Sequence, residues 1–255
     1  MKQLMWVLIF AFFSSVMSAA ANECRWGQPP TIIFEAPHEL HQYWTIDDAP
    51  IYGAPSVTDD FAFLEFRSEI AKRVPDLDPF SILQREYNDF IRSGDPVFVS
   101  EAALTRFVLE KKAGSIRPIH CLESLLLSVQ LKRQSMIDQP SEFGAFLMRK
   151  GDAAQMQLRI YFSTWDKPGG KIDSKVWDRI ERDLADGWIL ERHLHNHNFM
   201  FQDPVSVMGG VCPSRPDLRM YIDLVHAHGL QAASVTNGLS TIDLTVADIL
   251  SLTTQ

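Results

Sequence analysis

The stretch WILERHLHNH, from Trp188 to His197, decides the fold prediction for this chain of 255 residues. It predicts a β-strand that gives way to a loop, and it carries His193, His195 and His197 at a period of two. Alternate side chains of a strand point to the same face, so a His-x-His pair brings two imidazoles to one point at little conformational cost. A carboxylate from a neighbouring element could complete a three-ligand metal site.

Such a carboxylate follows in the stretch Ser214-Arg215-Pro216-Asp217, which opens a predicted helix. Two histidines and one carboxylate, with water in the open fourth position, are a common arrangement of hydrolytic zinc. Taken singly, however, each feature has a simpler structural explanation. The histidines can form a polar strand surface that never meets a metal. Ser214 and Asp217 can form a capping box that stabilises the helix.

The residue patterns on both sides of this stretch predict a mixture of helices and strands. Predicted helices cover residues 61–74, 81–92, 100–112, 175–186 and 217–228. Predicted strands cover residues 143–149, 155–163 and 188–197, with two more within 231–246, and Lys150-Gly151-Asp152 predicts a hairpin turn. This order indicates an α/β (α+β) domain in which a mixed sheet is flanked by helices.

The first 21 residues resemble a secretory signal peptide. Lys2 precedes an apolar run over 4–13, and small residues at 18–21 could form a cleavage site. That run is too short for a confident membrane span. We therefore expect an exported protein, periplasmic or secreted, with no stable span after signal removal.

The remaining chain divides into an N-terminal extension of unknown role, 22–97, and a domain over 98–255. The formal net charge of −8 disfavours nucleic acid or an anionic membrane surface as a partner. The sequence leaves the oligomeric state open.

Cys24, Cys121 and Cys212 allow one disulfide and one free thiol in an exported protein. All three pairings stay open, as does a fully reduced chain.

Glu123 stands out because it lies in the apolar run Cys121-Leu122-Glu123-Ser124-Leu125-Leu126-Leu127. Burying an unpaired carboxylate is costly, so it must reach solvent or be held for a purpose. The order of a Glu opening an apolar strand, a hairpin, a His-x-His strand and a Ser-x-x-Asp helix resembles the JAB1/MPN/Mov34 (JAMM) metalloenzyme family. The resemblance covers residues 100–246 and implies a JAB/MPN-like metallohydrolase domain.

The resemblance implies that His195, His197 and Asp217 bind Zn²⁺. His193 with His195 is the alternative pair, and His193 is otherwise a group beside the site. The implied activity is a zinc-dependent peptidase or isopeptidase-like amide hydrolase that acts on a peptide or protein substrate outside the cytoplasm.

In this family pattern Glu123 would be the general base and Ser214 would stabilise the oxyanion. The chain departs from the pattern at Asn198, where Pro is usual, and near Leu126, where a small residue is usual. Residues 199–212 are interpreted as an inserted loop. Two other hypotheses therefore stay open, a catalytically inactive MPN-like module that binds a partner and an exported His-rich metal-binding protein.

Overall fold

The structure is a computed structural model that describes residues 24–47, 54–56, 58–137, 139–151, 156–167, 169–201 and 209–255. The predicted signal peptide, Asp152 of the predicted hairpin turn and residues 202–208 of the predicted inserted loop lie outside these ranges.

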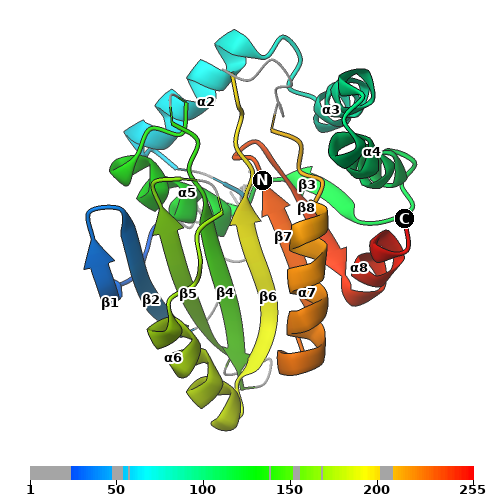
Figure 1. The fold of residues 1–255 in the computed structure, drawn as a ribbon. Coiled ribbons are helices and arrows are strands. Elements are labelled where there is room, and N and C mark those ends of the chain that lie inside the picture. Colours follow the sequence, from blue (N-terminus) through cyan, green and yellow to red (C-terminus); the bar gives the residue numbers. More distant parts are fainter. Residues whose placement is uncertain are drawn as a thin grey trace, which may run out of the picture.

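The described residues form one mixed sheet of eight strands in the order β1-β2-β5-β4-β6-β7-β8-β3 (Figure 1). Its strands are β1 (Thr31–Ala36), β2 (Glu39–Asp47), β3 (Ser115–Pro118), β4 (Phe143–Lys150), β5 (Gln157–Trp165), β6 (Ile189–Asn196), β7 (Ala232–Thr236) and β8 (Ser240–Thr245). Neighbouring strands are antiparallel except β6 and β7, which are parallel. The predicted mixed α/β fold is confirmed.

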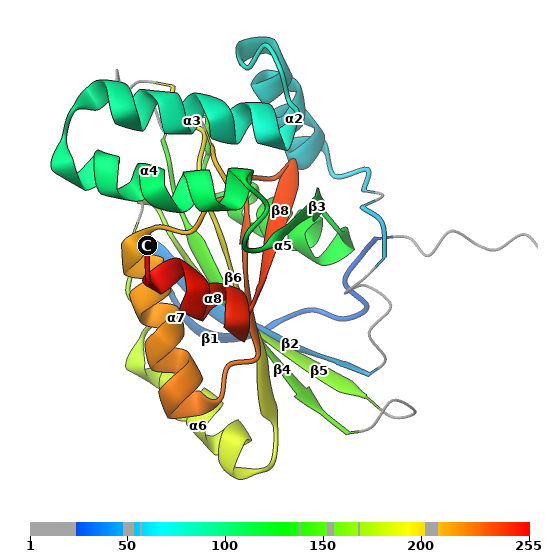
Figure 2. The same cartoon turned by 90° about the vertical axis from the view of Figure 1, so that its right-hand side faces the viewer.

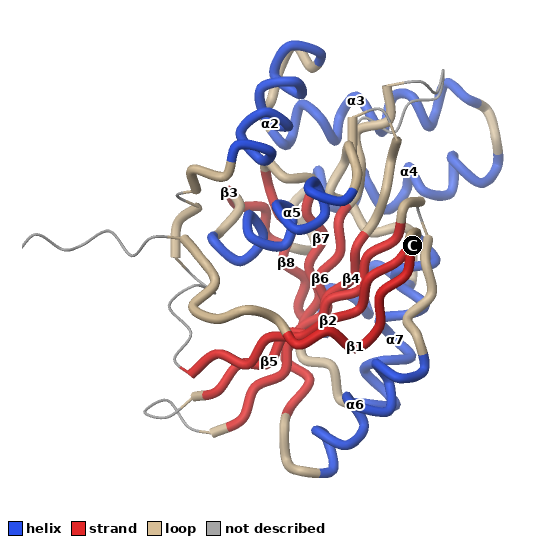
Figure 3. Tube along the Cα trace, turned by 90° about the vertical axis from the view of Figure 1, so that its left-hand side faces the viewer, coloured by secondary structure: helices blue, strands red, loops and turns tan. Residues whose placement is uncertain are grey.

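Helices cover both faces of the sheet. They are α2 (Phe61–Arg73), α3 (Pro79–Ser93), α4 (Pro96–Leu109), α5 (Cys121–Arg133), α6 (Ser174–Ala185), α7 (Arg215–His228) and α8 (Val246–Thr253). Figures 2 and 3 show α5 and α2 on one side of the sheet and α6 and α7 on the other. Within the described residues, every helix is too short or too polar to span a lipid bilayer.

Two apolar cores follow from the alternation of side chains along the strands. On β4, Phe146 and Met148 join the core that contains residues of α3, α4, α6, α7 and α8. Ala145 and Leu147 on the same strand join the core that contains residues of α2 and α5. A strand buried on both faces reads as a continuous apolar run, which is what β4 shows in the sequence.

The described part of the segment 22–97 contributes strands to the same sheet as the rest of the described chain. Strands β1 and β2 extend the sheet beyond β5, and the predicted boundary at residue 97 falls inside α4. Helix α4 starts earlier than expected because Asp95 caps it and Pro96 stands in its first turn. Gly94, with φ of 66°, ends α3 just before this cap, so α3 and α4 form a tight hairpin (Figure 2).

The prediction that Glu123 opens a strand is wrong, because Glu123 is the third residue of helix α5. Residues 121–128 of this helix are all buried. A helix with no polar face lacks the 3.6-residue pattern and cannot be told from a buried strand by periodicity.

The structure joins Cys24 to Cys121 in a disulfide and leaves Cys212 as a buried free thiol. The bridge ties the start of the described chain to the first residue of α5 across a sequence separation of 97.

Replacing both Cys24 and Cys121 with Ser is expected to lower the free energy of unfolding by about 2–4 kcal/mol, since the bridge closes a long loop. Urea unfolding should show this loss. Reductant should destabilise the wild type to the same level and leave the double variant unchanged. Equal stability of oxidised wild type and variant would contradict the prediction.

Candidate metal centre

Strand β6 and the residue that follows it place His195 and His197 beside the N-terminal end of α7. The strand lies between β4 and β7, with His195 opposite Gly144 on one side and Val235 on the other. His197 lies just beyond β6, where its backbone N–H donates to the Thr236 carbonyl at 2.8 Å. The ladder to β7 thus continues far enough to fix the backbone of both residues.

Asp217 reaches the same point from α7. Ser214 is the N-cap, and its Oγ accepts a hydrogen bond from the Asp217 N–H at 3.3 Å. In return Asp217 Oδ2 accepts hydrogen bonds from the Ser214 N–H at 2.8 Å and the Ser214 hydroxyl at 2.7 Å. The capping box is therefore present, and it holds Oδ2 in place beside the histidines.

Three potential ligand atoms converge at this point. His195 Nε2 and His197 Nε2 lie 3.2 Å apart, and Asp217 Oδ2 lies 3.5 Å from the first and 3.4 Å from the second. Each residue offers one ligand atom, all within 4.8 Å of one another, so this group could bind a metal ion. The predicted set of His195, His197 and Asp217 is thus brought together.

Hydrogen bonds at the far ring nitrogens orient both imidazoles. His197 Nδ1 lies 3.0 Å from the Gly210 carbonyl, which can only accept, so Nδ1 carries the proton of the neutral ring and Nε2 is free to coordinate. His195 Nδ1 lies 3.0 Å from the hydroxyl of Tyr221. Burial raises the pKa of Tyr221 well above its usual range, so this hydroxyl stays neutral.

His193 does not belong to this group of ligands. Its ring packs 4.8 Å from the ring of Phe146 and 5.6 Å from that of Tyr221. Burial, helped by the charge of His195, lowers the pKa of His193 to about 3. The alternative pair of His193 with His195 is therefore not the one that the structure places beside Asp217, and His193 is a neutral packing residue.

In the absence of metal, the neighbours of His197 and Asp217 shift the pKa values of both residues. Burial disfavours the charge on His197, but hydrogen bonding to Asp217 and its charge outweigh burial and raise the pKa of His197 to about 9. Burial acts against the Asp217 carboxylate too, yet His195 and His197 hold its pKa well below the usual range. An ionised carboxylate thus faces a ring that is cationic near neutral pH.

A cavity of about 500 Å³ adjoins the three ligands. Its walls include Phe90 and Phe98 of the α3–α4 hairpin, whose rings stack with centroids 5.4 Å apart. Its polar lining includes Glu86, Glu101 and Glu142, whereas none of the described lining residues is Lys or Arg. The cavity is therefore apolar with an acidic character around the ligands.

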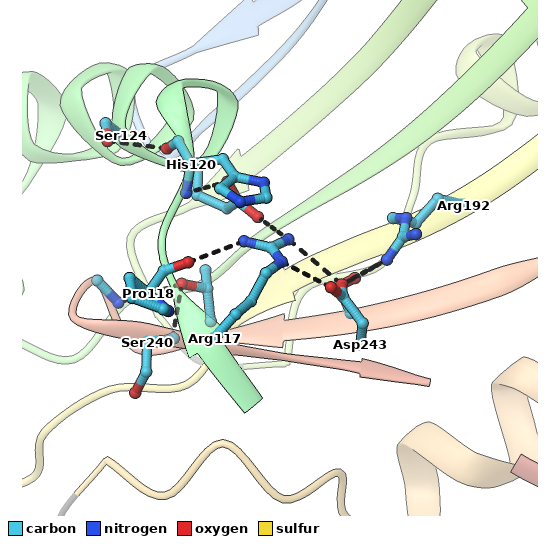
Figure 4. A network of polar contacts seen from close by, with 11 residues as sticks. Arg117, Pro118, His120, Ser124, Arg192, Ser240 and Asp243 are labelled. Carbon is cyan, nitrogen blue, oxygen red and sulfur yellow. Dashed lines mark hydrogen bonds and ion pairs between the residues drawn. The ribbon is translucent and has the colours of Figure 1, made fainter. Parts of the chain in front are cut away.

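Glu123 lies away from this cavity. Its Oε1 accepts from Arg117 Nη2 at 2.6 Å and its Oε2 from the His120 N–H at 2.8 Å, so both oxygens are engaged at the start of α5. Figure 4 shows Arg117 continuing to Asp243, which also binds Arg192. Glu123 is not among the described residues that line the cavity. The structure thus explains the buried carboxylate as an ion-paired helix cap and does not place it as a base.

A different carboxylate, Glu142, lines the cavity. It is half-buried, directly precedes β4, and its charge contributes to the raised pKa of His197. The next residue, Phe143, donates its N–H to Asn196 Oδ1 at 2.7 Å, and Asn196 lies between the two histidine ligands. The sequence did contain a signal for Glu142, because a carboxylate stands at the start of the strand that pairs with the His-x-His strand.

Ser214 also lines the cavity. No family model matches the chain, and neither the curated proteins nor the solved structures yield a similar one. Membership of the JAMM family therefore stays a prediction.

Metal binding is expected to release protons, because His197 must lose the proton that it holds below pH 9 in the free protein. With Zn²⁺ as the probe, about one proton should be released per bound ion near pH 7. The apparent Kd for Zn²⁺ should therefore fall about tenfold for each unit by which the pH rises. Calorimetry in two buffers of different ionisation enthalpy measures this release. Heats that are independent of the buffer would contradict the pKa of His197.

Proposed function

We propose that this protein is a zinc-dependent amide hydrolase, a peptidase or isopeptidase-like enzyme that acts on peptide or protein substrates outside the cytoplasm. The observation that carries the proposal is the convergence of two imidazole nitrogens and one carboxylate oxygen beside a cavity of about 500 Å³.

The donor set fits zinc in a catalytic role. Two histidines and one carboxylate are ligands that zinc takes in hydrolytic sites, whereas structural sites are usually closed by four protein ligands. His195, His197 and Asp217 would hold the ion, and the described residues show no fourth ligand in this group. When bound, zinc supplies a water of lowered pKa and polarises a carbonyl group.

Glu142 is the carboxylate best placed to accept the proton of an attacking water. Glu86 is almost fully buried, and both oxygens of Glu101 accept from the Arg215 N–H. Glu142 Oε2 accepts from the Gly169 N–H at 2.7 Å, which orients the carboxylate at the cavity and leaves Oε1 for a proton. The same carboxyl would return that proton to the leaving amine.

Ser214 would stabilise the developing negative charge on the carbonyl oxygen, as the resemblance implies. Its hydroxyl lines the cavity but donates to Asp217 Oδ2 in this structure, so it must turn toward the substrate to act. The acidic character of the cavity favours apolar or basic peptide segments over acidic ones.

Glu142→Gln and Glu123→Gln are a matched pair that tests the base. Glu142→Gln should lower kcat by about 10²–10⁴-fold with zinc content unchanged, since general base catalysis contributes that much. Glu123→Gln should leave kcat unchanged and lower thermal stability, because it weakens a buried ion pair. Hydrolysis of a fluorogenic peptide library, with and without chelator, measures kcat.

Zinc stoichiometry of His195→Ala, His197→Ala and Asp217→Ala provides the control, and each should lose the ion. Full activity of Glu142→Gln would exclude Glu142 as the base. A wild type that binds no zinc, or hydrolysis that survives complete removal of metal, would refute the proposed function.

A further inference from the structure

The α3–α4 hairpin contributes two carboxylates that face the metal centre but are not among its ligands. Glu86 lies on α3 and Glu101 on α4, and both line the cavity. Glu86 packs against the backbone of Gly210, and Glu101 accepts from the backbone N–H of Arg215.

Glu86 is linked to His197 through Gly210. Its carboxyl accepts from the Thr105 hydroxyl at 3.3 Å and packs against the backbone of Gly210. The carbonyl of Gly210 in turn accepts from His197 Nδ1 at 3.0 Å. Gly210 therefore joins a buried carboxyl on one side to the ring of a metal ligand on the other.

The backbone at Gly210 has little freedom to move. A Cβ atom on Gly210 would lie 1.6 Å from Glu86 Oε2, so the carboxyl packs directly against the backbone. Gly209 has φ of 66°, and its carbonyl accepts from Asn237 Nδ2 at 2.7 Å. A Cβ atom on Gly209 would lie 2.7 Å from the ring of Phe199. The carbonyl that orients His197 is thus held between these neighbours.

Glu101 makes the corresponding link to Asp217. Its Oε2 and Oε1 accept from the backbone N–H of Arg215 at 3.1 Å and 3.3 Å. The Arg215 guanidinium reaches back to the Ser100 carbonyl at 3.0 Å and the Ser100 hydroxyl at 3.2 Å. Arg215 is the first residue of α7 and Asp217 the third, so α4 fixes the turn that presents the carboxylate ligand.

Burying a carboxyl is costly, and burial raises the pKa of Glu86 to about 7 and also raises the pKa of Glu101. Among the described residues Glu86 Oε2 has no hydrogen-bond partner. An apolar residue would pack the same space without this cost, so the carboxyl at this position does not serve stability alone.

We propose that Glu86 and Glu101 are positioning residues of the metal centre, Glu86 acting on His197 through Gly210 and Glu101 acting on Asp217 through Arg215. The α3–α4 hairpin is then part of the metal site and not a cover added to it. The inference rests on the proposed metal-dependent function, because it assigns the two residues a role only if the site binds an ion.

Glu86→Met and Glu86→Gln are matched in length and differ in whether the side chain can accept a hydrogen bond. Groups that orient metal ligands typically contribute 10–100-fold to metal affinity. Glu86→Met is therefore expected to raise the zinc Kd by about 10–100-fold, whereas Glu86→Gln should stay within about threefold of wild type. Competition titration against a chromophoric chelator measures the Kd without any need for activity. The same result is expected for Glu101→Met against Glu101→Gln.

Ile82→Ala separates positioning from stability. Ile82 is fully buried on α3 and does not line the cavity, so this variant should unfold more easily but keep its zinc affinity. The absorption spectrum of bound Co²⁺ gives a second readout, which should change in Glu86→Met and stay as in wild type in Ile82→Ala.

Wild-type affinity in both Glu86→Met and Glu101→Met would overturn the inference and leave the proposed function standing. Absence of zinc binding in the wild type would overturn both. If Glu86→Met does not fold, Glu86→Asp replaces it, because the shorter side chain keeps the carboxyl but withdraws it from Gly210. Glu86→Asp should then weaken zinc binding about tenfold, and unchanged affinity would overturn the role of Glu86.

Discussion

The candidate metal centre depends on one carboxylate that serves two structures at once. Asp217 closes the capping box of α7 and faces the Nε2 atoms of His195 and His197 with the same oxygen, Oδ2. The N-terminus of a helix carries a partial positive charge, which favours an ionised carboxylate there. The hydrogen bonds that cap α7 therefore also hold the Asp217 carboxylate at the end of the strand that bears the histidines. The start of α7 and the end of β6 are both fixed relative to this oxygen.

The pKa shifts of His197 and Asp217 show how the site is held without an ion. His197 is cationic near neutral pH and Asp217 is ionised, so a proton on His197 supplies positive charge at the point where a metal ion would sit. The negative charge of the buried Asp217 carboxylate is then balanced both with and without a bound ion, which avoids the penalty for an unpaired charge. His195 is held by the neutral hydroxyl of Tyr221. The site can thus be preformed before it binds metal.

The part of this arrangement that lies within single strands and helices could be predicted from the sequence. Alternation along a strand places His195 and His197 on one face, and Ser214 with Asp217 follows a recognisable capping pattern. The position of Glu123 could not be predicted, because α5 is buried all round and its apolar run has no helical period. Glu86 lies in the predicted N-terminal extension of unknown role and Glu101 in a predicted helix of the following domain. Their neighbours Gly210 and Arg215 are more than 100 residues away in the sequence. Only the packing of the α3–α4 hairpin on the sheet creates those contacts.

The carboxylates around the metal centre differ in the groups that they contact. Asp217 faces the imidazoles, Glu101 accepts from a backbone N–H, and Glu142 stands half-buried at the cavity. Glu86 has a pKa of about 7, and the charge of His197 already favours its ionised form. Glu86 should ionise more readily when a divalent cation replaces that single charge, because a larger positive charge nearby stabilises the carboxylate further.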